Sequence, residues 1–217
     1  MRRASSYVEP DMFGSGVSRW PFVEIEGVPL CRHLEPRAYS LVMIDPCWHF
    51  VTRSPKGDEK SPQAKYRTMT LADIAALPVG DLAHADGCLF WVWVTGAGLR
   101  DQMRMLDAWG LRFVTSGAWV KTTVHGKLAF GTGYVLRNCH EPYIIAASGR
   151  PVTKSKSVRS AILAPVREHS RKPDEAYRDA RLLIPTGRAA DVFSCQTRPG
   201  WEAWGNEAGL YDKLEAA

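Results

Sequence analysis

The feature that most constrains this chain is a pair of short, continuously apolar segments at residues 41–44 and 88–94. A strand with one face in water alternates apolar and polar residues, and neither segment shows that alternation. Continuous apolar runs of this length are typical of strands that are buried in a sheet. The sequence therefore predicts two central strands of a buried sheet.

Segments with apolar residues at helical spacing, or with helix-start signals, alternate with the predicted strands. Residues 99–109 carry apolar side chains at helical spacing, and Gly110 ends that pattern. Thr70 can cap a helix, and Pro173 followed by two acidic residues is typical of a helix start. Strands are predicted at 39–44, 88–94, 114–120, 143–147 and 190–193. Alternating strands and helices predict an α/β fold, with a mostly parallel central sheet and helices on both faces.

Length and composition fit one globular domain. The chain has 217 residues, of which 45% are hydrophobic and 24% charged, so we expect a flexible arm at 1–19 and a single domain at 20–217. The net charge of +5 is compatible with a polyanionic partner but does not require one.

Cysteine usage and the apolar runs bear on location and cofactors. The five cysteines are scattered without metal-ligand spacing, which favours reduced thiols in a cytoplasmic protein and no metal site. We expect no membrane association, because no apolar run approaches the roughly 18 residues that span a bilayer. The basic N-terminus is not followed by the apolar stretch of a signal peptide.

The tetrapeptide Asp45-Pro46-Cys47-Trp48 directly follows the first apolar segment. Ligands of open α/β sheets bind at the edge where such strands end. The Asp45 carboxylate and the Pro46 carbonyl can accept the two N–H bonds of a nucleobase amino group, and the Trp48 indole can stack on the ring. The alternatives are a plain turn with a solvated carboxylate, and an indole that plugs the sheet edge.

The order of motifs along the chain resembles a known family. It is similar to the N6-adenine methyltransferases related to the catalytic subunit of the eukaryotic messenger-RNA adenosine methyltransferase, which include many bacterial and phage members that act on DNA. The resemblance runs from about residue 41 to residue 207. It rests on the segments 45–48, 66–70, 89–95, 119–121, 131–134, 169–175, 199–201 and 204–207.

The resemblance implies a Rossmann-like methyltransferase fold with a permuted motif order and S-adenosylmethionine as methyl donor. It also implies that Asp45 and Pro46 polarise the target amine and that Trp48 holds the base. Lys172 would bind the carboxylate of the donor, beside a helix N-terminus. The donor-binding residues that we expect are Asp45, Lys172, Asp191, Gln196, Asn206 and Glu207.

Substrate contacts are expected from loops. By resemblance, Tyr66 lies beside the target base. Lys121, Arg137 and Arg171 are candidate phosphate contacts, together with Lys127 and Arg167, although surface cations often form only a solvated face. Two positions depart from the family: Cys47 replaces a usual proline, which we expect to loosen the turn, and residues 194–197 lack the family's usual pattern.

These observations predict an adenine-specific DNA methyltransferase of bacterial or phage type. DNA is the expected partner, with RNA as the alternative, and a homodimer and a heterodimer are both open as assemblies. Enzyme alternatives are methylation of RNA adenine or of the N4 amine of cytosine, because the same two acceptors serve any exocyclic amine. The non-enzyme alternative is a degenerate relative that binds nucleic acid or acts as a scaffold.

Overall fold

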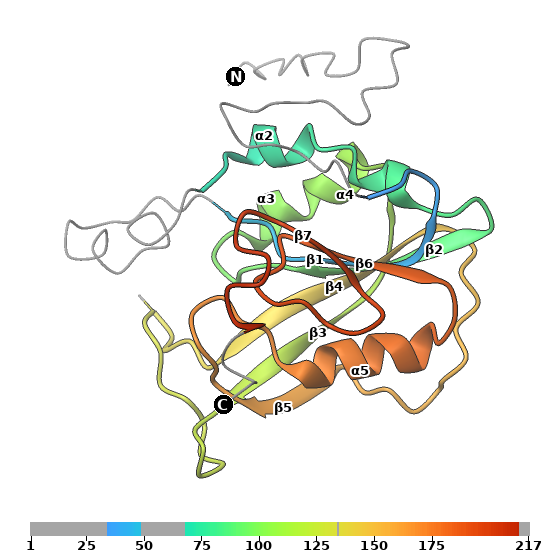
Figure 1. Cartoon of the computed structure of the whole chain (residues 1–217). Helices are drawn as coiled ribbons and strands as arrows, with labels where there is room; N and C mark the ends of the chain where they lie inside the picture. Colours follow the sequence, from blue (N-terminus) through green and yellow to red (C-terminus); the bar gives the residue numbers. More distant parts are fainter. Residues whose placement is uncertain (1–33, 49–67, 134, 213–217) are drawn as a thin grey trace, which may run out of the picture.

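The computed structural model describes residues 34–48, 68–133 and 135–212 (Figure 1). The arm expected at 1–19 therefore lies outside the described residues, as does Tyr66. Seven strands form one sheet in the order β5-β3-β4-β2-β1-β6-β7. Their bounds are β1 Tyr39–Ile44, β2 Gly87–Trp93, β3 Arg112–Thr122, β4 His140–Gly149, β5 Ala161–Pro165, β6 Arg188–Val192 and β7 Glu202–Trp204.

The sheet is mixed, with a mostly parallel character. Four pairs of neighbours are parallel, and only β4 runs against its neighbours β2 and β3 among the described strands. This reversal matters for the site, because it brings the start of β4 to the edge at which the other strands end.

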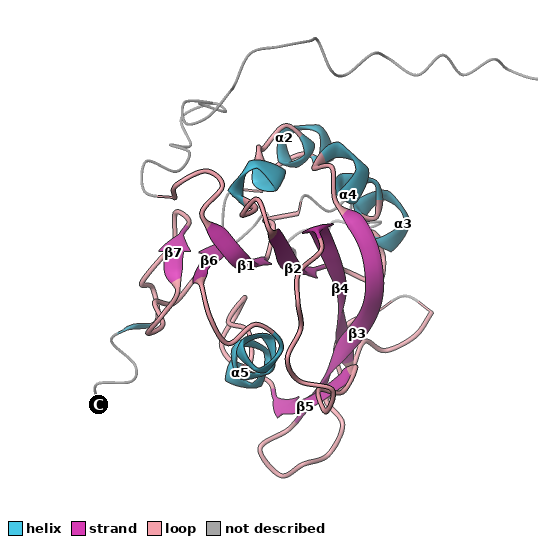
Figure 2. Cartoon of the chain, turned by 90° about the vertical axis from the view of Figure 1, so that its right-hand side faces the viewer, coloured by secondary structure: helices cyan, strands magenta, loops and turns pink. Residues whose placement is uncertain are grey.

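Helices cover both faces of the sheet (Figure 2). One face carries α2 (Leu71–Ala75), the 3-10 turn η2 (Val79–Leu82), α3 (Leu99–Gln102) and α4 (Arg104–Ala108), and the other carries α5 (Asp174–Leu183). The predicted α/β fold is confirmed.

The continuous apolar strands are explained by two separate cores. Val42 and Ile44 of β1 face the core that contains α2 and α4, whereas Leu41 and Met43 face the core that contains α5. Successive side chains of a strand point to opposite faces, so a strand with a core on each side must be apolar at every position.

Some elements differ from the sequence-based prediction. The helix predicted at 99–109 is divided at Met103 into α3 and α4. The Gln102 side chain turns inward, where it accepts a bond from the Thr95 backbone N–H at 2.7 Å and donates to Thr95 Oγ1 at 3.0 Å. These contacts tie the first turn to the end of β2. The short strands β5 and β7 were not predicted.

Candidate active site

The candidate site lies at the edge of the sheet where β1, β3 and β6 end. Asp45 directly follows β1, and its backbone N–H donates to the Val192 carbonyl at 3.1 Å, which ties the motif to β6. Because β4 is antiparallel, Glu141 at its start lies opposite Trp119 in the β3 ladder, next to Lys121. Residues from separate strands therefore meet at one point.

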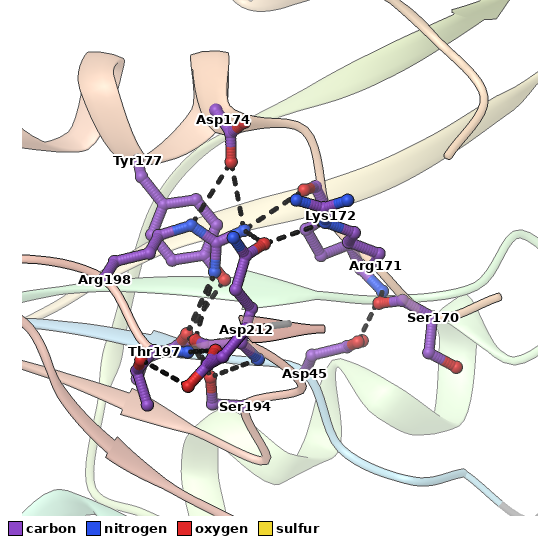
Figure 3. A network of polar contacts seen from close by, with 12 residues as sticks. Asp45, Ser170, Arg171, Lys172, Asp174, Tyr177, Ser194, Thr197, Arg198 and Asp212 are labelled. Atoms are coloured by element: carbon purple, nitrogen blue, oxygen red, sulfur yellow. Dashed lines mark hydrogen bonds and ion pairs between the residues drawn. The ribbon is translucent and has the colours of Figure 1, made fainter. Parts of the chain in front are cut away.

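Four charged side chains form what we call the ion chain, in the order Asp45, Lys172, Glu141 and Lys121. Lys172 Nζ pairs with Asp45 Oδ2 and lies 3.1 Å from Glu141 Oε1. Lys121 Nζ lies 2.7 Å from the other oxygen of Glu141, Oε2. The Lys172 side chain is 7% exposed and that of Asp45 is 20% exposed. Figure 3 shows Asp45 beside the loop that carries Lys172. The chain alternates two anions with two cations.

Burial and neighbouring charges set the protonation of the ion chain. Burial raises the pKa of Asp45 to about 6, although the charge of Lys172 opposes the change. Burial alone would raise the pKa of Glu141, but the charges of Lys172 and Lys121 bring it below its ordinary value. The two carboxylates likewise raise the pKa of Lys172 against the effect of its burial. Lys172 is thus charged at neutral pH.

The turn after Asp45 has its own hydrogen bonds. The Trp48 backbone N–H donates to the Pro46 carbonyl at 2.8 Å, and the Met69 N–H donates to the Cys47 carbonyl at 2.9 Å. A carbonyl oxygen has two lone pairs, so Pro46 retains capacity for a second donor. The bond from Met69 fixes the turn at the position where the family's proline is replaced by Cys47.

Trp48 is packed into the core and is not open to solvent. It is 5% exposed and belongs to the cluster on the α2 and α4 face. Its indole Nε1 has no hydrogen-bond partner within the described part of the chain. This placement favours the alternative in which Trp48 plugs the sheet edge, while stacking on a base stays a prediction.

Asp191 lies in β6, and its side chain belongs to a hydrogen-bond network that includes Tyr177 of α5. Its carboxylate accepts hydrogen bonds from Tyr177 Oη at 3.0 Å and Ser194 Oγ at 2.8 Å. The guanidinium of Arg198 lies 3.7 Å from the same oxygen and stacks 3.6 Å from the centre of the Tyr177 ring. Burial raises the pKa of Asp191 to about 6, against these stabilising contacts. The Asp191 carboxylate, predicted to bind the donor, is therefore engaged within the protein.

A second polar contact joins the loop of Lys172 to the turn after β6 (Figure 3). Gln196 Oε1 accepts from Arg171 Nε at 2.8 Å and from Arg198 Nη2 at 3.1 Å, and all three side chains are largely buried. Arg171 also pairs with Glu168 at 3.1 Å. These contacts favour a bracing role for Gln196 and Arg171, whereas their predicted ligand contacts are untested.

Residues 205–212, which we call the C-terminal strap, contact the turn after β6 and the loop that carries Lys172. Asp212 accepts from the Thr197 backbone N–H at 2.8 Å and from its hydroxyl at 2.7 Å. The Tyr211 hydroxyl donates to the His169 carbonyl at 2.7 Å, so the strap connects the turn after β6 to the loop that carries Lys172.

Two predicted donor contacts lie in the strap itself. Asn206 is exposed, and Glu207 is partly exposed and accepts a weak bond from Cys195 Sγ at 3.7 Å. Both therefore remain accessible at this edge of the structure.

The predicted phosphate contacts are in different environments. Arg137 is exposed, donates to the Gly133 carbonyl at 3.3 Å and lies over the Phe130 ring. Lys127 is exposed, Arg167 pairs with Asp174, and Lys121 belongs to the ion chain. Lys121, Arg167 and Arg171 are thus engaged in ion pairs within the protein, Lys127 and Arg137 are exposed, and contact of these residues with phosphate stays a prediction.

Sequence reasoning assigned no role to Tyr177 or Ser194, and it interpreted Glu141 first as a residue that organises a loop. The signal for Glu141 was its place just before an apolar strand in the motif His140-Glu141. That signal indicates a site residue only once β4 is known to be antiparallel. Within the described ranges, no cluster of His, Cys, Asp and Glu could hold a metal ion, and no helix has the length and apolarity to cross a membrane.

Comparison with known proteins places the chain in a family. The chain is 30% identical over 173 residues to the N(6)-adenosine-methyltransferase MT-A70-like protein of Arabidopsis thaliana, which covers 78% of this chain and 24% of that protein. It is 29% identical over 174 residues to the human N(6)-adenosine-methyltransferase catalytic subunit METTL3, covering 78% of this chain and 28% of that protein.

A fungal relative matches over a larger part of its own length. The N6-methyladenosine RNA methyltransferase MTA1 of Cryphonectria parasitica is 26% identical over 195 residues, which covers 83% of this chain and 55% of that protein. The chain thus spans about a quarter of the plant and human relatives. Residues 39–207 match the MT-A70 family, and the Rossmann-like α/β fold agrees with that match. The chain therefore belongs to the MT-A70 family.

Proposed function

We propose that this protein transfers a methyl group from S-adenosylmethionine to the N6 amino group of adenine in a nucleic acid. The observation that carries the proposal is the Asp45 carboxylate, placed at the end of β1 beside the Pro46 carbonyl and in contact with the buried cation Lys172. The family of the chain supports the reaction class.

The residues at the site suit the chemistry of this donor. Lys172 supplies a buried cation next to the start of α5, where unpaired backbone N–H groups also attract anions, so it suits the donor's carboxylate. Asp45 supplies a carboxylate for the positive part of the donor. Asn206 and Glu207 provide accessible polar groups for its ribose and adenine. When bound, S-adenosylmethionine supplies an electrophilic methyl group on a sulfonium.

The acceptor amine needs help from the protein, because its lone pair is delocalised into the adenine ring. Asp45 and the second lone pair of the Pro46 carbonyl accept its two N–H bonds, which localises the lone pair on nitrogen. The N–C bond then forms as the S–C bond breaks. The amine loses one proton, which the Asp45 carboxylate can accept.

For the polymer, we propose DNA, as the motif pattern of bacterial and phage members suggests. The second candidate is RNA, which the names of the relatives favour, since they refer to adenosine and, in the fungal protein, to RNA. A partner subunit is also part of the proposal, because the human relative is named as a catalytic subunit. We propose a cytoplasmic location from the scattered cysteines.

The test is nucleoside mass spectrometry on DNA and RNA from methylation-deficient cells that express the protein or its Asp45→Asn variant. We expect N6-methyladenine that the variant lowers about 10²–10³-fold, the range for removal of one preorganised electrostatic contact. Asp86→Asn is the matched control, because its side chain is 94% exposed and precedes β2, at the opposite edge of the sheet.

The outcomes separate the alternatives. The mark in DNA supports the first candidate, and the mark confined to RNA supports the second. Methylcytosine in place of methyladenine would refute the choice of base. No mark with the wild-type protein, alone or with a partner subunit, would favour a degenerate scaffold.

A further inference from the structure

The ion chain includes Glu141, a residue to which the proposed methyl transfer gives no role. Lys172 has two carboxylate partners, Asp45 and Glu141, although one would neutralise it. Glu141 in turn has two cation partners, because Lys121 binds its second oxygen at 2.7 Å. Within the described residues, Asp45 lies at the end of the ion chain and pairs with one cation, Lys172, which it shares with Glu141.

A shared cation has a consequence for the catalytic carboxylate. While Lys172 pairs with Asp45, that carboxylate is less available to accept N–H bonds from an amine. If Lys172 moved away from Asp45 and had no other partner, its buried charge would be uncompensated. Burying an unpaired charge costs free energy. Glu141 offers Lys172 such a partner, because its Oε1 lies 3.1 Å from Lys172 Nζ.

We propose that Glu141 is a positioning residue that shares Lys172 with Asp45, so that Lys172 can turn to the donor's carboxylate while its charge stays paired. Donor binding would thereby release Asp45 for the acceptor amine. This inference rests on the proposed function for its reaction, but the sharing itself is a property of the donor-free protein.

The sharing makes a signed prediction for the titration of Asp45. Removing the charge of Glu141 leaves Lys172 to Asp45 alone and removes a nearby negative charge, so the pKa of Asp45 falls. Without the charge of Lys121, the Glu141 carboxylate interacts more strongly with Lys172. Lys172 then stabilises the Asp45 carboxylate less, so the pKa of Asp45 rises. The other titratable groups near Asp45 are unchanged in both variants; they are Cys47, Tyr177, Asp191, Cys195 and Glu207.

The first experiment is a carboxyl ¹³C NMR titration of the donor-free protein, with Asp45→Asn to assign the signal. We expect Glu141→Gln and Lys121→Met to move the midpoint of Asp45 in opposite directions, each by about one pH unit. Asp86→Asn should leave it in place. Movement in the same direction, or no movement, would overturn the proposal. Lys121→Met acts at the more accessible end of the chain, so it tests the proposal even if Glu141→Gln fails to fold.

The second experiment is calorimetric binding of S-adenosylhomocysteine, which has the same carboxylate as the donor. We expect Glu141→Gln to weaken binding roughly tenfold, since among the described residues Asp45 is then the one carboxylate partner left to Lys172, and Lys172 must give it up to bind the donor. Unchanged affinity would refute the role of Glu141 in donor binding. Opposite NMR shifts in a protein that methylates no substrate would instead support the sharing and reject the proposed function.

Discussion

Asp191 offers a direct test of how burial and polar contacts balance in this protein. The Asp191→Asn substitution preserves the shape of the side chain and keeps an oxygen to accept from Tyr177 and Ser194, but it removes the charge. Burial raises the pKa of Asp191 from an ordinary 3.8 to about 6. Between these two values, the folded protein binds a proton that the unfolded chain has released.

The size of the effect follows from this difference in pKa. One pKa unit corresponds to about 1.4 kcal/mol, so a difference of about two units corresponds to roughly 3 kcal/mol. The native state binds more protons than the unfolded state, so the contribution of Asp191 to the free energy of unfolding falls as pH rises from about 4 to 6. Its side chain is only 2% exposed, so solvent does little to screen it. Asparagine lacks this pH dependence.

The assay is urea denaturation of both proteins at pH 4, 5, 6 and 7, followed by circular dichroism. We expect the variant to gain stability relative to the wild type by roughly 3 kcal/mol between pH 4 and pH 7. The control Asp86→Asn, at a site that is 94% exposed, should change the free energy of unfolding by no more than about 0.5 kcal/mol. A flat or falling difference for Asp191→Asn would refute the reasoning and show that Arg198 stabilises the carboxylate by more than burial costs.

Two further substitutions test local packing and capping. Gly117→Ala would place a methyl group 2.3 Å from the Tyr143 hydroxyl, so we expect a loss of about 1–3 kcal/mol in unfolding free energy. Gly96→Ala is its control, because an added methyl group there meets nothing within 4 Å, and its thermal midpoint should barely move. Thr70→Ala removes the side chain that caps α2 and accepts from the Asp73 N–H, and should cost about 1 kcal/mol in chemical denaturation. An unchanged midpoint for Gly117→Ala would show that the β3 backbone can shift to accept the methyl group.

Much of the fold could be predicted from hydrophobic pattern alone. Strands β1 and β2 have cores on both faces, which leaves a continuous apolar signal at Val42 and its neighbours. The strand β7 has only three residues, Glu202–Trp204, too few for a periodicity to be recognised. The short β5 has the expected alternation, but its exposed positions include the apolar Leu163, which obscures the pattern.

The site was predictable where it depends on local sequence and not where it depends on strand direction. Asp45 follows an apolar strand and could be identified from its neighbours, whereas the role of Lys172, which precedes a helix start, was expected from the resemblance to the family. A residue before a strand in a parallel sheet lies at the edge away from the site. Glu141 lies at the site because β4 is reversed, and the direction of β4 follows from pairing with β2 and β3, not from the residues around Glu141.

The contacts of the C-terminal strap indicate how far the chain must extend for the site loops to stay connected. The region that matches the MT-A70 family ends at residue 207, yet Tyr211 and Asp212, which bind the strap to His169 and Thr197, come after it. A protein cut after residue 207 would therefore lose both sets of hydrogen bonds. The end of the family match is not the end of the contacts that hold the site loops together, so a truncation or fusion at the C-terminal side should keep residues 208–212.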